Sequence, residues 1–150
     1  MINLVLLKIE LLVCALMGLI FIVDLCTDKK DISRFIAMAG SFGILMFSFF
    51  FKDTGTTFFG AYISDSLSIF FKILFLLNVF LVIILSLDFL KKNPQYTGEY
   101  FILLLSATLG MLLMVSSQEL VTFYISLELL SISSYILSAY QKPNPRSTEA

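Results

Sequence analysis

Five long runs of apolar residues, separated by short polar breaks, constrain this chain more than any other feature. The runs lie at 3–25, 34–51, 66–88, 99–116 and 119–140. A helix needs about 20 residues to cross a hydrocarbon layer of about 30 Å, so each run suffices, although the second is short. The runs are too long and too unalternating for barrel strands. We predict an all-α, polytopic membrane protein with five transmembrane helices in a single unit.

The composition agrees with this prediction. Of the 150 residues, 59% are hydrophobic and only 14% are charged. A soluble domain of this size has too little interior to bury so much apolar surface, so the lipid bilayer is the first expected partner. The chain has no basic patch that would suggest a nucleic-acid partner. The first apolar run is too long for a cleaved signal and lacks a basic region before it, so we expect it to remain as an anchor.

Residues that bind metals and redox groups are scarce. The chain has no histidine, and its two cysteines, Cys14 and Cys26, form no CxxC pair. Histidine and paired cysteines are the usual ligands of haem, zinc and copper. We therefore expect no cofactor, metal ion or redox centre in this chain, and we interpret the two thiols as small apolar side chains.

Basic residues are distributed unevenly between the polar breaks. The first, third and fifth breaks carry Lys29, Lys30, Arg34, Lys91, Lys92, Lys142 and Arg146, whereas the second and fourth carry only Lys52. Cytoplasmic loops of membrane proteins are enriched in Lys and Arg. This asymmetry predicts an N-terminus outside, and it makes residues 141–150 a polar cytoplasmic connection after the fifth run.

Glu128 is the principal candidate site residue, because it lies near the middle of the fifth apolar run. By helix rise each end of that run is about 15 Å away, too far for the side chain to reach water. An acidic group at this depth costs about 2.5 to 3.5 kcal/mol on insertion scales, so it is seldom incidental. Tyr124, Ser131 and Tyr135 share its helix face. We interpret the face as a path for a proton carried by Glu128; the alternative is a protonated glutamate that bonds to a neighbouring helix.

Lys72 in the third run is the second candidate. Ser68 and Asp65 share its face, toward the outer end of the helix. It is either a buried cation that tunes Glu128 or another carboxylate, or a side chain that extends outward to the interface. Glu10 lies about two turns into the first run beside Lys8, and we expect these two to pair at the interface.

Small residues suggest possible close contacts between helices. Gly40 with Gly43, and Gly110 with Ser106 and Ala107, would let two helices approach closely. Glycine is also simply common in membrane helices, and we prefer that explanation slightly.

Several of these segments resemble one known family. The segment Ser126–Tyr135, which reads SLELLSISSY, the RSTEA of residues 146–150, and the helix start Asp65–Lys72 are similar to subunit N of bacterial NADH:quinone oxidoreductase, whose mitochondrial counterpart is subunit 2 of complex I. The resemblance extends over the whole chain and is specific from about Gly98 onward. It identifies the chain as the N-terminal portion of an antiporter-like subunit of this family.

The resemblance implies a function. Family members have about fourteen helices, and a glutamate in the fifth, matched by Glu128, lies opposite a lysine in the broken seventh; the pair is thought to gate proton movement. Other subunits of the complex would bind NADH, FMN, iron–sulfur clusters and quinone. The chain would lie in the inner or plasma membrane, and its partners would be other membrane subunits of the complex. The matching lysine would lie beyond Ala150, so we expect a truncated or partial chain that does not pump protons alone.

Two alternative functions remain open. The same helix-five glutamate occurs in subunits of multi-subunit cation/proton antiporters and membrane-bound hydrogenases, although the motifs around Glu128 fit subunit N more closely. The other alternative is a non-transporting membrane scaffold.

Overall fold

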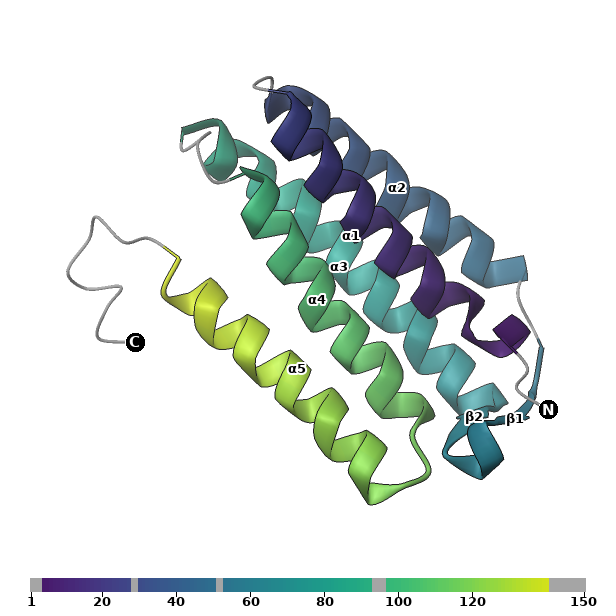
Figure 1. Cartoon of the computed structure of the whole chain (residues 1–150). Helices are drawn as coiled ribbons and strands as arrows, with labels where there is room; N and C mark the ends of the chain where they lie inside the picture. The colour runs from purple at the N-terminus through teal and green to yellow at the C-terminus, as the bar shows by residue number, and fades with distance from the viewer. Residues whose placement is uncertain (1–3, 28–29, 51–52, 93–96, 141–150) are drawn as a thin grey trace.

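The computed structural model describes residues 4–27, 30–50, 53–92 and 97–140. A short 3-10 helix, Leu4–Leu7, leads into the first of five long α-helices (Figure 1). These are α1 (Lys8–Cys26), α2 (Lys30–Phe50), α3 (Ser66–Lys92), α4 (Thr97–Ser116) and α5 (Leu120–Ser138). All five are long and apolar enough to cross a membrane, which confirms the predicted fold class. Residues 141–150, interpreted above as a cytoplasmic connection, lie outside the described residues.

Two helices extend four residues further than the predicted runs. Helix α2 begins at Lys30 rather than at Arg34, so it includes charged residues that precede the apolar run. Helix α3 continues to Lys92 rather than ending at Asp88. Hydropathy alone misses such ends, because charged residues extend a helix beyond its apolar part.

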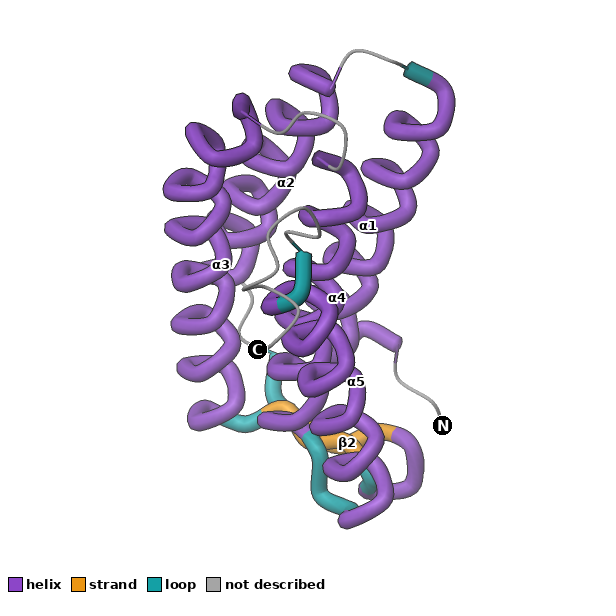
Figure 2. The backbone as a smooth tube through the Cα atoms, turned by 90° about the vertical axis from the view of Figure 1, so that its left-hand side faces the viewer, coloured by secondary structure: helices purple, strands orange, loops and turns teal. Residues whose placement is uncertain are grey.

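Helices α1 to α4 form an up-and-down bundle, and α5 lies outside it against α4 (Figures 1 and 2). Around the bundle, α1 packs on α2 and α4, and α3 packs on the same two helices. The bundle core contains side chains spaced three, four or seven residues apart, the spacing of one helix face. Its members include Ile9, Val13, Leu16, Ile20, Leu76, Val79, Ile83, Phe101, Leu105 and Leu112. Many outward-facing apolar side chains remain exposed, as lipid contact requires.

A small β-hairpin covers one end of the bundle. Strands β1 (Gly55–Thr57) and β2 (Tyr62–Ser64) pair antiparallel, with the 3-10 turn Phe58–Gly60 between them. The backbone N–H of Gln118, in the turn between α4 and α5, donates to the carbonyl of Ala61 at 2.9 Å. The sequence predicted only a polar loop here. The hairpin therefore joins the α2–α3 connection to the α4–α5 turn and places β2 beside the ends of the helices (Figure 2).

Candidate functional site

Glu128 lies near the middle of α5, as predicted, and its side chain is partly exposed. The Tyr124 hydroxyl, one turn earlier on the same face, interacts with the Glu128 carboxyl group. Tyr135 lies further along and is 71% exposed. Ser131 donates to the Leu127 carbonyl of its own helix at 2.8 Å. The four candidate residues therefore form one polar stripe, within which the described contact is between Tyr124 and Glu128.

This stripe is turned away from α4. The buried face of α5 carries Ser126 and Ser133, and Ser133 bonds to Ser106 of α4 at 2.9 Å. At 100° per residue, Glu128 lies almost opposite these two serines. Among the described helices, α5 packs mainly against α4, so no other helix of this part of the chain covers the stripe.

Helix α4 approaches α5 closely at a glycine. A Cβ atom on Gly110 would lie 2.9 Å from both the backbone nitrogen of Leu130 and the backbone oxygen of Ser126. Our preference for Gly110 as an ordinary membrane glycine was therefore wrong, because backbone atoms cannot move aside as side chains do. Gly43, by contrast, has nothing within 4 Å of such a Cβ.

Lys72 is fully buried, and it contacts Glu10 rather than Glu128. Its ammonium nitrogen lies 2.8 Å from Oε1 of Glu10, and the two side chains are 2% and 3% exposed. Helix α4 lies between α3, which carries Lys72, and α5, which carries Glu128 (Figure 1). Of the two interpretations of Lys72, the buried cation beside a carboxylate is the one the structure has, and that carboxylate is Glu10.

The expected interfacial pair of Glu10 with Lys8 was wrong. Lys8 is oriented toward Asp53, with its Nζ atom 3.8 Å from the carboxylate, and both side chains are about half exposed. Glu10 instead points into the bundle. Position in the sequence suggested the neighbour two residues away, but residues i and i+2 face different sides of a helix.

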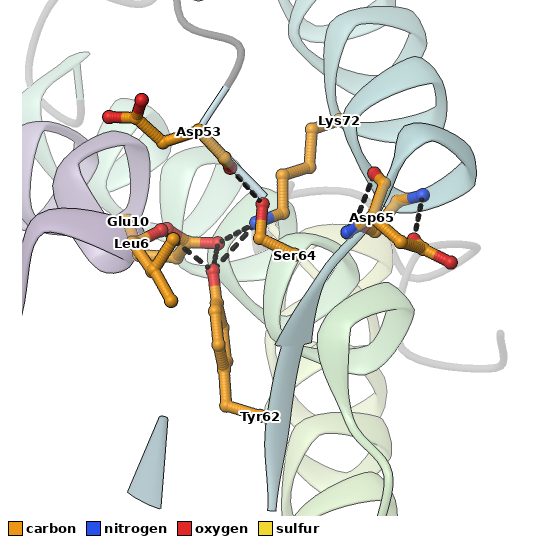
Figure 3. A network of polar contacts seen from close by, with 8 residues as sticks. Leu6, Glu10, Asp53, Tyr62, Ser64, Asp65 and Lys72 are labelled. Atoms are coloured by element: carbon orange, nitrogen blue, oxygen red, sulfur yellow. Dashed lines mark hydrogen bonds and ion pairs between the residues drawn. The ribbon is translucent and has the colours of Figure 1, made fainter. Parts of the chain in front are cut away.

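Tyr62 of the hairpin completes this buried group, in a position that sequence reasoning missed. Its hydroxyl accepts a hydrogen bond from Lys72 at 2.6 Å and lies 2.8 Å from Oε1 of Glu10 and 3.2 Å from the Leu6 carbonyl (Figure 3). Burial raises the pKa of Tyr62 well above its ordinary range, and the nearby Glu10 charge raises it further. We call Glu10, Lys72 and Tyr62 the buried triad.

The triad is held in place by the start of α3. Asp65 accepts a hydrogen bond from the Ser68 backbone N–H at 2.8 Å, and its own N–H donates to the Ser68 hydroxyl at 2.8 Å. This reciprocal pair caps the helix that carries Lys72. The Ser68 backbone bond is the main reason that the pKa of Asp65 is lowered, and the Lys72 charge contributes least. Among the described residues, no group of His, Cys, Asp or Glu could hold a metal ion.

Comparison with known proteins shows which proteins the chain is similar to. No family model matches the chain. NADH-quinone oxidoreductase subunit N of Moorella thermoacetica is 39% identical over 153 residues, which cover all of this chain and 32% of that protein. The Heliobacterium modesticaldum subunit N is 40% identical, with 99% of this chain and 32% of that protein covered. The chain is related to subunit N of NADH-quinone oxidoreductase.

The relationship to subunit N extends beyond these two bacteria. NAD(P)H-quinone oxidoreductase subunit 2 of a Synechocystis species is 38% identical over 137 residues, covering 88% of this chain and 26% of that protein. The chain thus spans about a third of the length of the subunit N relatives it matches. Together with the five apolar helices, the relationship makes the chain a multi-pass membrane protein.

Proposed function

We propose that this chain forms part of a proton-translocating membrane subunit of an NADH-quinone oxidoreductase, in which Glu128 carries the proton. The relationship to subunit N supports the complex. The single observation that supports the carrier is the position of Glu128 in the middle of an apolar helix, next to the Tyr124 hydroxyl. An acidic side chain at this depth is costly and therefore seldom incidental.

The uncovered stripe on α5 agrees with this role. Glu128, Ser131 and Tyr135 face away from α4, and a polar stripe is stable inside a membrane only when protein or water lies against it. In the subunit N relatives, about two thirds of the sequence lies outside the matched part. Those further helices would cover the stripe and supply the opposing cation. Five helices therefore provide one side of a proton path.

The energy for transport would come from elsewhere in the complex. Moving one charge across 100 mV requires about 2.3 kcal/mol, which quinone reduction would supply. NADH, FMN, iron–sulfur clusters and quinone would bind to other subunits, and the partners of this chain would be the neighbouring membrane subunits. The relationship to subunit N favours the inner or plasma membrane. The distribution of Lys and Arg favours an N-terminus outside.

The test uses a complete subunit N in which this chain replaces the matching third of a relative. We expect Glu128→Gln to leave assembly and electron transfer intact while strongly lowering the number of protons pumped per electron. Glu119→Gln is the matched control, because Glu119 is an exposed residue just before α5. A complex with this substitution should pump normally. Normal pumping by an assembled Glu128→Gln complex would exclude Glu128 as the carrier.

A further inference from the structure

The buried triad lies outside the proton path proposed for Glu128. We propose that Glu10 is a second proton site, at the hairpin end of the bundle, and that Lys72 controls whether it holds a proton. This site shares no residue with the stripe on α5, so it stands or falls independently of Glu128.

A fixed structural ion pair would leave few unused hydrogen-bonding atoms. In the triad only Oε1 of Glu10 is bonded; Oε2 is buried and has no hydrogen-bond partner among the described residues. A buried carboxylate oxygen without a partner is costly, and a proton on it lowers that cost because it removes the buried charge. Oε2 of Glu10 is therefore the atom at which one proton could be accepted.

The Tyr62 hydroxyl is compatible with both states of Glu10. It has one proton to donate and two acceptors in reach, Glu10 Oε1 at 2.8 Å and the Leu6 carbonyl at 3.2 Å. When Glu10 is charged, the hydroxyl donates to Oε1. When Glu10 is neutral, the hydroxyl can rotate to the Leu6 carbonyl without any movement of the ring. The network thus stays bonded on either side of a protonation step.

Asp65 is the nearest other carboxylate along the helix face of Lys72. It lies seven positions earlier, immediately before α3, and the Lys72 charge is the smallest of the causes that lower its pKa. Figure 3 shows the ammonium group near Glu10, with Asp65 on the other side of the lysine stem. Glu10 is buried and Asp65 is partly exposed. Movement of the ammonium toward Asp65 would leave Glu10 buried without its counter-charge.

The step itself is a simple proton transfer. As the Lys72 ammonium leaves, the Glu10 carboxylate takes one proton from water at the hairpin end and becomes a neutral carboxyl group. When the ammonium returns, the proton goes back to water, and Lys72 keeps all three of its own protons. A charge placed near Lys72 by a neighbouring helix could drive this exchange.

Few other charges can interfere. The described titratable groups around Glu10 are Lys72 and Tyr62, together with Cys14 on its own helix and the exposed pair Lys8 and Asp53. The charged residues of α2 and α4, among them Asp31, Arg34 and Glu99, lie at the opposite ends of those helices. Lys72 is therefore the dominant charge on Glu10.

The experiment is infrared spectroscopy of this chain in lipid nanodiscs at neutral pH, with ¹³C-labelled glutamate carboxyl groups. In the unaltered chain Glu10 should give a carboxylate band, assigned by its loss in Glu10→Gln. In Lys72→Met a protonated carboxyl band should appear and should vanish in Lys72→Met with Glu10→Gln. Removal of a contacting cation changes the ratio of protonated to charged carboxyl about tenfold to thousandfold. Glu99→Gln, which alters an exposed glutamate, should leave these bands unchanged.

Other outcomes would overturn the proposal. A folded Lys72→Met chain whose Glu10 stays charged shows that the lysine does not control the proton. If Lys72→Met unfolds while the double variant folds, Glu10 cannot accept a proton in place, and the pair is purely structural. If neither variant folds, acidification of the unaltered chain decides: protonation of Glu10 with helicity retained supports the site, and protonation only upon unfolding excludes it.

Discussion

The ammonium nitrogen of Lys72 lies 2.8 Å from a carboxylate oxygen of Glu10 in the interior of the bundle. The two residues come from α3 and α1, which pack mainly through α2 and α4, so the ion pair crosses the centre of the bundle. Taking two charges out of water costs several kcal/mol for each ion, and their attraction offsets this only with good geometry. The buried ion pair is therefore weak evidence for a stabilising role. It is better explained by a functional role.

The Tyr62 hydroxyl is the neutral member of the triad, and its removal can be tested without changing any charge. Tyr62→Phe keeps the ring and the hairpin packing but deprives Lys72 and Glu10 of a hydrogen-bond partner. Hydrogen bonds to charged groups contribute about 1.5 to 3 kcal/mol. We expect a loss of about this size in the free energy of unfolding, measured by titration with sodium dodecyl sulfate in mixed micelles. Tyr135→Phe, at an exposed position, should change it little.

Tyr62 also makes the fold sensitive to alkali. Burial, and then the Glu10 charge, raise its pKa in the folded chain above the ordinary value of about 10. A group whose pKa is higher in the folded state favours folding fully below the unfolded pKa, and this contribution is lost as the pH rises above it. Unfolding free energies should therefore fall above about pH 10. The fall should be shallower in Tyr62→Phe; equal slopes would show that other groups cause it.

The five helices follow from the sequence because lipid requires long apolar runs, and such runs are visible residue by residue. The pairing of Glu10 with Lys72 was not predictable in the same way, since it depends on which helices lie across the bundle from one another. Both residues do lie near the N-terminal end of their helices, Glu10 in the first turn of α1 and Lys72 in the second turn of α3, and matching polar residues by depth would have suggested the pair. Tyr62 gave no such signal, because its loop has no periodic pattern.

Glu128 illustrates the opposite case. Its depth in α5 and its neighbour Tyr124 were visible in the sequence, since both depend only on the geometry of a single helix. A charge opposite Glu128 would depend on other helices, because among the described helices α5 packs mainly against α4. Local geometry is thus predictable here, and contacts between helices are not.

The cap on α3 gives a prediction for acid. Asp65→Ala removes the acceptor of the Ser68 N–H, which should lower the free energy of unfolding by about 1 kcal/mol, whereas Asp65→Asn should cost less. The lowered pKa of Asp65 means that its charge favours folding above about pH 3.9, and that this contribution disappears as the pH falls through the folded-state value. Acid titrations should show a smaller loss of stability for Asp65→Ala than for the unaltered chain. Parallel acid curves would contradict this.

Gly110 controls how closely α5, and with it Glu128, lies against the bundle. A methyl group at this position would meet the backbone of α5 at 2.9 Å, closer than side-chain carbons approach. Because neither backbone can shift locally, Gly110→Ala should push the two helices apart at a cost of about 1 to 3 kcal/mol. Spin-label distances between α4 and α5 should increase. Gly43→Ala is the matched control, since nothing lies within 4 Å of its Cβ position, and it should leave the distance unchanged. An unchanged α4–α5 distance in Gly110→Ala would mean that the close contact does not hold α5 in place.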